Sequence, residues 1–169
     1  MNNNDIFAMR YRPCVGIMLL NKAQQAFIGK RRDVKGNAWQ MPQGGIDPHE
    51  TVVEAALREL QEEIGTDNVS LLAVSQQVLR YDFPRAVKGK VWGGCYRGQA
   101  QRWVLMQFQG RDEDINLFTE HPEFIEWRWE NLPEVERLAV PFKKEIYAAV
   151  IKEFLPYIQK RGKILRADS

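Results

Sequence analysis

Short apolar runs separated by polar turns make up the first part of the chain. The run CVGIMLL at 14–20 is continuously apolar and rich in β-forming residues, which is typical of a buried strand. The turn NKAQQ follows it, and AFIGKR at 26–31 returns as a second strand. Gly, Pro and Asn punctuate the next stretch, DVKGNAWQMPQGGIDP, so we expect a long loop there.

An amphipathic helix is expected after this loop. Its apolar residues recur at helical spacing and form one stripe, made of Val53, Ala56, Leu57, Leu60 and Ile64. Two start signals are present, because 47–50 offers an N-cap, a proline and a third-position glutamate, and 51–54 offers a second capping box. Gly65 suits the left-handed position that ends a helix.

The rest of the chain predicts further strands and a closing helix. Strand-like runs cover 70–83, 102–110 and 124–130, and an amphipathic helix is expected over 141–160, with Pro156 kinking or ending it. Strands on both sides of one helix, followed by a terminal helix, predict an α/β fold with a mixed sheet covered on two faces.

Composition narrows the class of protein. A chain of 169 residues with 44% hydrophobic and 27% charged residues is typical of one globular domain, which we place at 1–160, followed by a flexible basic tail at 161–169. The net charge of +2 is too small to indicate nucleic-acid binding by itself. Two cysteines fit a reducing compartment.

Targeting signals are not evident. The first residues, MNNNDIFAMRYRP, contain no apolar signal-peptide core, and no apolar run is long enough to span a bilayer. We therefore expect a cytoplasmic protein that does not bind membranes, and nothing in the sequence indicates an obligate protein partner.

Three carboxylates crowd the end of the predicted helix. Glu59, Glu62 and Glu63 share one helix face beside the apolar stripe, near the C-terminus, where the helix dipole disfavours anions. Carboxylates ~6 Å apart repel by roughly 2–3 kcal/mol at an effective dielectric of ~20. A solvated helix face is the alternative interpretation. A hard divalent cation would relieve the repulsion, so the cluster favours a Mg²⁺ or Mn²⁺ site.

The wider spacing is more specific than the carboxylates alone. Five residues separate Gly44 from Glu50, and seven more precede the run RELQEEIG at 58–65. The segment 44–66 resembles the signature of the Nudix hydrolases, with Thr66 at a position that is usually aliphatic. The resemblance implies the Nudix fold, a mixed β-sheet sandwiched between α-helices. It also implies metal-dependent hydrolysis of a nucleoside diphosphate linked to another group.

Roles for the motif residues follow from the resemblance. It implies metal ligands at Glu59, Glu62 and Glu63, joined by the backbone carbonyl of Gln43, and a catalytic role for Glu59 and Glu62. The remaining motif residues are implied to be structural: Gly44 and Gly45 for close backbone approach, Glu50 and Arg58 as an ion pair, and Gly65 at the helix end. For Glu50, a capping role is equally available.

A further carboxylate is expected from outside the helix, because Nudix enzymes often recruit one to complete the metal site or to activate water. In TEHPEFIEW the candidates are Glu120, Glu123 and Glu126. We prefer Glu123 as a catalytic residue and metal ligand, because it just precedes a strand and could be presented at its end. A solvated loop glutamate is the alternative.

Resemblance outside the motif reduces the number of possible substrate classes. The segments YRPCVGIMLLN, WQMPQGGID, YDFP, GQAQRW and PEFIEWRW resemble bacterial RNA pyrophosphohydrolases and the related asymmetric dinucleoside polyphosphate hydrolases, over about residues 10 to 155. The implied reaction is removal of pyrophosphate from 5′-triphosphorylated RNA, which initiates mRNA decay, or cleavage of a dinucleoside polyphosphate. A Nudix module that binds nucleotide without turnover is disfavoured because the motif glutamates are intact.

Substrate contacts are implied at four positions. Arg12 and Arg31 match arginines of the subgroup that bind phosphate and the 5′ end, while Tyr81 and Phe142 match aromatic positions near the nucleobase. Phe142 could equally belong to the core. Basic residues at Arg85, Lys88, Lys90, Arg97 and Arg102 are further candidates, with solubilising surface charge as the alternative.

Overall fold

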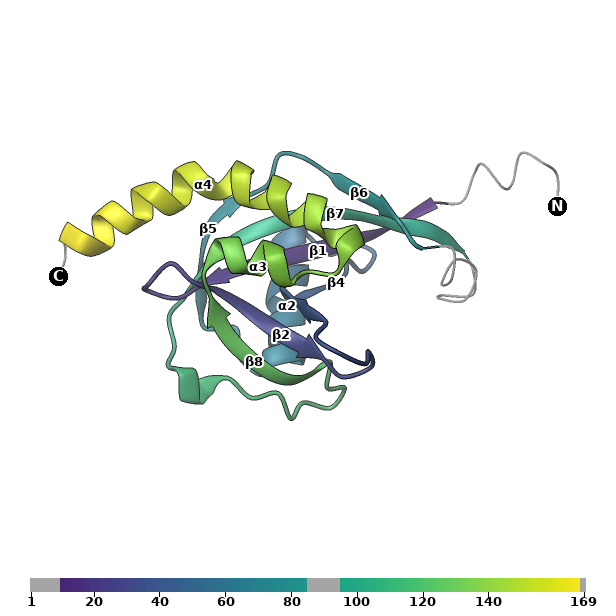
Figure 1. Ribbon diagram of the computed structural model, residues 1–169, viewed down its shortest axis with the longest axis horizontal. Coiled ribbons are helices and arrows are strands. Elements are labelled where there is room, and N and C mark those ends of the chain that lie inside the picture. The colour runs from purple at the N-terminus through teal and green to yellow at the C-terminus, as the bar shows by residue number, and fades with distance from the viewer. Residues whose placement is uncertain (1–9, 85–94, 168–169) are drawn as a thin grey trace.

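The computed structural model describes residues 10–84 and 95–167, and it confirms the expected α/β architecture with a mixed sheet (Figure 1). In the described part of the chain, the sheet has eight strands: β1 Arg10–Leu20, β2 Ala26–Arg31, β3 Trp39–Gln40, β4 Gln43–Gly45, β5 Val69–Val74, β6 Leu79–Asp82, β7 Tyr96–Phe108 and β8 Phe124–Glu130. The helices are α2 Val52–Ile64, α3 Leu132–Leu138 and α4 Lys144–Ala167, with 3-10 turns η2 Asp112–Asp114 and η3 Pro141–Lys143.

Strand β1 is the centre of the fold. It pairs in parallel with β7 along its whole length and antiparallel with β2 and β4, while β5 pairs antiparallel with the far side of β7. Its side chains alternate between two cores: Val15 and Ile17 pack with α2, while Met18 and Leu20 pack with α3 and α4. Because both faces are covered, the strand reads as a continuous apolar run in the sequence.

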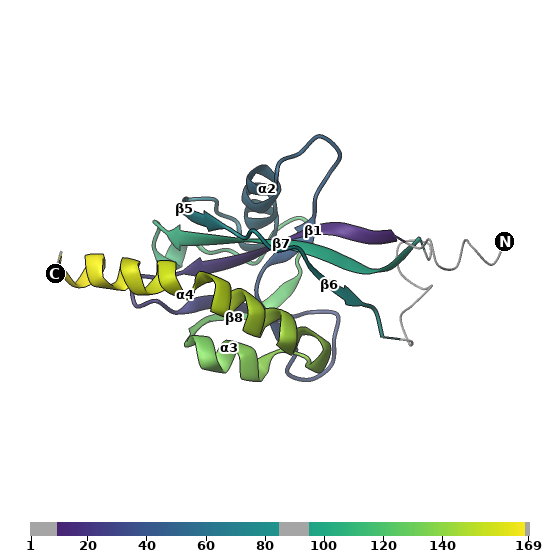
Figure 2. The same cartoon turned by 90° about the horizontal axis from the view of Figure 1, so that it is seen from above.

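The helices cover the sheet from opposite sides. Figure 2 shows α2 on one face and α3 with α4 on the other. Of the stripe expected from the helical spacing, Ala56, Leu60 and Ile64 are buried on the α2 side, and Val53 and Leu57 are only partly buried. Ala55, outside the expected stripe, is buried as well. No helix in the described part of the chain is long and apolar enough to cross a membrane.

The expected long loop at 33–48 contains two short strands. β3 pairs with β2, and β4 pairs with β1, with Gly44 opposite Val15. β4 pairs with the side of β1 that faces away from β7, and this backbone pairing outweighs the local preference of glycine and proline for irregular structure. The motif loop is thereby attached directly to the central strand.

The expected strand at 70–83 is wrong as one continuous element, because the chain leaves the sheet between β5 and β6. The Ser75 hydroxyl donates to the Gln77 carbonyl at 3.0 Å and accepts from the Trp103 backbone N–H at 2.9 Å. At the break, the Ser75 side chain therefore satisfies backbone groups that strand pairing would otherwise satisfy. Both β5 and β6 still pair with β7.

The closing helix differs from its expected bounds at both ends. Residues 141–143 form the turn η3, and α4 continues through Pro156 to Ala167, so the proline does not end it. Phe154 and Ile158 are buried on either side of Pro156, and this packing favours a continuous helix despite the lost backbone donor. The flexibility of 161–169 stays a prediction, although 161–167 are helical.

Candidate active site

A cleft of about 790 Å³ opens beside the C-terminal half of α2. Its lining comes from α2, β4, the end of β2, β6 and the start of the terminal helical region. It contains each side chain predicted to bind metal or substrate: Arg12, Arg31, Glu59, Glu62, Glu63, Tyr81, Glu123 and Phe142. These residues come from six separate stretches of sequence and meet in one cavity. The alternatives Glu120 and Glu126 do not line it.

Helix α2 is fixed at both ends. Of the two possible start signals, the capping box of Thr51 and Glu54 is the one used, and each side chain bonds the other residue's backbone N–H. Gly65 closes the helix in the left-handed conformation, with φ of 75°. These caps set which side chains of the helix face the cleft.

The predicted ion pair between Glu50 and Arg58 is present, and Arg58 lies at the centre of a larger network. Its Nε is 2.8 Å from Glu50 Oε2, and its Nη2 donates to the Gly45 carbonyl at 2.8 Å. Its Nη1 lies 2.8 Å from Glu59 Oε1 and 3.3 Å from Glu62 Oε2. One guanidinium therefore ties the motif loop to the helix and orients two carboxylates.

Glu50 also forms a hydrogen bond within the motif loop. Its Oε1 accepts a hydrogen bond from the Asp47 backbone N–H at 3.0 Å, so it caps the turn before α2 instead of capping the helix. The Arg58 hydrogen bonds, followed by that of Asp47, lower the pKa of Glu50 to about 2. The carboxylate is ionised at every physiological pH.

Glu59 packs directly against the glycine loop. A Cβ atom on Gly44 would lie 1.9 Å from the Glu59 Cδ atom, so this close approach requires glycine. The Glu59 side chain is almost fully buried, and burial raises its pKa against the opposing effect of Arg58. The carboxylate is held in place while its charge is only partly compensated.

Glu63 is the most deeply buried of the acidic residues in the cleft, at 5% exposure. Its Oε2 atom is buried and has no hydrogen-bond partner. Burial first, and then the charges of Glu59 and Glu123, raise its pKa well above the usual value, while the Gln43 backbone N–H opposes the shift. A buried carboxylate oxygen without a partner is unfavourable unless something positive binds it.

This donor set fits a divalent metal. Glu59 and Glu63 offer buried carboxylate oxygens, and Glu62 and Glu123 offer exposed ones at the same cleft. Within residues 10–84 and 95–167, no three acidic, His or Cys side chains already converge as a ligand set. Arg58 pairs with Glu59 Oε1 and Glu62 Oε2, so a cation would share these two carboxylates with the guanidinium.

Basic residues line the same cleft as these carboxylates. Arg12 lies against Gly45, where a Cβ atom would meet its Nη2 at 2.4 Å, and Arg31 forms an ion pair with Asp33 at 2.6 Å. Sequence reasoning missed Lys143, which is 3% exposed and donates to Gln40 Oε1 at 3.0 Å. Burial lowers the pKa of Lys143 to about 8. The only sequence signal is its place beside Phe142 in the run PFKK.

Tyr81 and Phe142 form an aromatic pair in the cleft. Their ring centroids are 5.5 Å apart, and Phe142 is 40% exposed, so it is not a core residue. The Tyr81 ring is largely buried, and this burial raises the pKa of its hydroxyl. One ring is therefore anchored and the other is open to a ligand.

Other basic candidates have structural partners. Arg97 pairs with Asp82 at 2.8 Å and lies over the Tyr11 ring, and Arg102 donates to the Ser75 carbonyl. Neither lines the cleft. Arg85, Lys88 and Lys90 lie outside the described residues.

Comparison with known proteins identifies the family. The NUDIX domain model matches residues 10–150. An RNA pyrophosphohydrolase of Wolbachia pipientis subsp. Culex pipiens is 53% identical over 150 residues, covering 88% of this chain and 92% of that protein. An RNA pyrophosphohydrolase of Rickettsia typhi is 48% identical over 158 residues, covering 94% and 98%.

Solved structures share the fold at much lower identity. A C. elegans Ap4A hydrolase complex has a TM-score of 0.63 at 17% identity, covering 88% of this chain and 98% of that one. The E. coli dihydroneopterin triphosphate pyrophosphohydrolase has a TM-score of 0.63 at 16% identity, covering 82% and 94%. With the family model matching most of its length and relatives about half identical, the chain belongs to the Nudix family.

Proposed function

We propose that this protein is a pyrophosphohydrolase that removes pyrophosphate from the 5′-triphosphate end of RNA. The observation that carries the proposal is the identity of about half the residues, over nearly full length, with relatives named RNA pyrophosphohydrolase. The cleft supports it, because buried carboxylates share one cavity with basic and aromatic side chains. The reaction takes place in the cytoplasm, where its RNA substrate is available.

The carboxylates of the cleft would hold the cofactor, Mg²⁺ or Mn²⁺. Its ligands would be carboxylate oxygens of Glu59, Glu62, Glu63 and Glu123, together with the backbone carbonyl of Gln43. When bound, the metal offsets the charge of the phosphate oxygens at the reacting centre. The unpartnered Glu63 oxygen supports this assignment, since binding a cation removes the penalty of its burial.

The basic and aromatic residues of the cleft bind the substrate. Arg12, Arg31 and Lys143 place positive charge where the triphosphate lies, and the bidentate geometry of arginine suits phosphate oxygens. Phe142 offers an exposed ring for the first base, braced by Tyr81. Arg58 positions Glu59 and Glu62 and has no contact with substrate in this assignment.

Water provides the nucleophile. Its oxygen forms a bond to a phosphorus of the triphosphate, the bridging P–O bond breaks, and pyrophosphate leaves from RNA that keeps a 5′-monophosphate. Glu123, an exposed residue of the cleft lining, accepts the proton of this water.

The decisive experiment compares two substrates under one set of Mg²⁺ conditions. We expect a higher kcat/KM for a short 5′-triphosphate RNA than for diadenosine tetraphosphate. The Glu62→Gln variant removes a metal ligand charge and should lower turnover at least ~100-fold with the fold intact. Glu113→Gln, at an exposed glutamate of η2 far along the chain, serves as the matched control.

Two results would contradict the proposal. RNA that is not measurably hydrolysed, while diadenosine tetraphosphate is, would assign the enzyme to dinucleoside polyphosphates. Unchanged turnover of both substrates in Glu62→Gln would remove the catalytic role of the motif glutamates. Loss of activity in Glu113→Gln to the same extent would show that charge loss alone disturbs the protein.

A further inference from the structure

A second cavity of about 450 Å³ lies next to the active-site cleft. We call it the downstream cavity. Its lining is mostly apolar and comes from the 115–127 region, with one arginine from the end of β2: Arg32, Ile115, Asn116, Leu117, Phe118, Pro122, Phe124, Ile125 and Trp127. No role in the proposed reaction uses these residues.

Only a thin rim separates the downstream cavity from the cleft. Arg31 lines the cleft, whereas its neighbour Arg32 lines the downstream cavity. On the paired segment, Glu123 lines the cleft and its neighbour Phe124 lines the downstream cavity. The two segments are paired: Arg31 is in register with Phe124, and the Arg32 backbone N–H donates to the Glu123 carbonyl at 2.9 Å. An extended ligand that leaves the cleft needs to cross only this pair of backbone segments to reach the downstream cavity.

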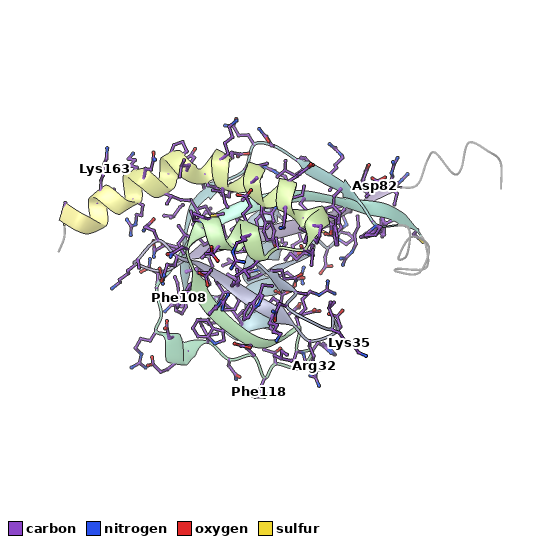
Figure 3. All side chains as sticks on the ribbon, in the orientation of Figure 1. Arg32, Lys35, Asp82, Phe108, Phe118 and Lys163 are labelled. Carbon is purple, nitrogen blue, oxygen red and sulfur yellow. The ribbon has the colours of Figure 1, made fainter. Side chains whose placement is uncertain are left out.

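The cavity exposes side chains that a folded protein normally buries. Phe118 is 94% exposed and Ile125 is 58% exposed. Figure 3 shows Phe118 at the margin of the molecule, with Arg32 and Lys35 labelled toward the same corner. The Phe118 backbone N–H donates to Asn116 Oδ1 at 2.9 Å, which orders the loop that carries the ring. Exposed apolar side chains gathered around one hollow indicate a binding site.

One ring of the cavity lining, Trp127, is packed against other aromatic rings. The Trp127 ring stacks on Phe27 with centroids 5.5 Å apart, and it also meets Trp129 edge-on at 5.7 Å. Phe27 is fully buried in the core on the α2 side. A flat ring held by the core next to a freely exposed ring is the arrangement that stacks nucleobases without sequence preference.

We propose that the downstream cavity binds nucleotides of the substrate RNA that follow its 5′ end. Bases stack against Phe118 and the apolar lining, and Arg32 pairs with a phosphodiester group as the chain crosses the rim. This assignment rests on the proposed function. Charge favours RNA as the occupant, because the single charged residue of the lining is an arginine at the side nearest the cleft.

The test measures how activity depends on RNA length. For Phe118→Ala, we expect the ratio of kcat/KM for a 5′-triphosphate octamer to that for a dinucleotide to fall by about ten-fold, the loss of one stacked base. Arg32→Gln should lower the same ratio and weaken its dependence on salt. Leu71→Ala, at an exposed apolar residue of β5 outside both cavities, is the matched control.

A binding measurement separates failure of this inference from failure of the proposed function. The probe is a fluorescent octamer with a 5′-monophosphate, which is the reaction product and needs no turnover. An affinity reduced about ten-fold in Phe118→Ala supports the downstream cavity even if triphosphate RNA is not hydrolysed. A wild-type length ratio together with wild-type affinity overturns it. Self-association that disappears in Phe118→Ala, with RNA affinity unchanged, would instead assign the surface to a second copy of the chain.

Discussion

Gly44 lies so close to Glu59 that a Cβ atom at Gly44 would sit 1.9 Å from the glutamate Cδ. Neither partner is free to move away. Pairing with Val15 holds Gly44 on the edge of β1, and the caps at Thr51 and Gly65 hold the helix that carries Glu59. The position of this carboxylate is therefore set by the absence of a side chain on the loop.

The Gly44→Ala variant should consequently lose activity before it loses its fold. The added methyl group forces Glu59 out of its place, and overpacking of this kind destabilises by about 1–3 kcal/mol. We expect kcat to fall at least ~10-fold for triphosphate RNA, measured with thermal unfolding of the same sample. Gly162→Ala is the control, because only Gln24 Cγ lies near, at 4.0 Å, and alanine favours a helix. Equal activity in both variants would contradict the argument.

The ion pair of Glu50 and Arg58 should make stability depend on pH in the acid range. The pKa of Glu50 falls from 4.5 to about 2 on folding, so its contribution is present above about pH 4.5 and is lost as pH falls toward 2. Glu50→Gln should cost about 1–2 kcal/mol at pH 7. We expect urea unfolding to show the gap between wild type and variant narrowing below pH 4.5. A gap that stays constant down to pH 2 would show that the stabilisation does not come from the ionised pair.

Much of the fold could be predicted because its signals are local. Side chains of β1 point alternately into the two cores, so the strand appears in the sequence as an unbroken apolar run. The apolar stripe of α2, its capping box and Gly65 all lie within 20 residues of sequence. The spacing of the motif glutamates is likewise a property of one segment. Such features need no knowledge of distant contacts.

Features that depend on distant contacts could not be predicted. β4 forms because the edge of β1 accepts it, and α4 passes Pro156 because Phe154 and Ile158 are packed on the sheet. Lys143 looked like any surface lysine, yet its burial beside Gln40 places it in the cleft. In each case tertiary packing outweighs the local preference of the sequence.

The aromatic pair in the cleft should separate base recognition from phosphate chemistry. Phe142→Ala removes the open ring and should raise KM for triphosphate RNA about five- to ten-fold with little change in kcat. Tyr81→Ala should do the same less directly, since the Tyr81 ring braces Phe142 at 5.5 Å. Inhibition by inorganic pyrophosphate, which has no base, is the internal control. A matching loss of pyrophosphate affinity would show that these rings only shape the cleft.

Glu63 should lower the stability of the metal-free protein at high pH, although it contributes to metal binding. Because burial raises its pKa well above 4.5, the protonated form stabilises the fold at low pH, and that stabilisation is lost as pH rises through the folded pKa. Glu63→Gln keeps a neutral side chain at every pH, so without divalent metal it should melt at a higher temperature than wild type at pH 8. The difference should be about 2–4 °C for each kcal/mol relieved, and should shrink at pH 5.

Added Mg²⁺ should reverse this order. A cation that binds the folded wild type raises its Tm in proportion to the logarithm of the metal concentration, whereas Glu63→Gln lacks the buried charge that holds it. Calorimetry with and without Mg²⁺ at pH 8 measures both effects in one pair of proteins. Chelated wild type that is more stable than Glu63→Gln, or equal metal stabilisation of the two, would mean that the buried oxygen of Glu63 is satisfied by something other than a cation.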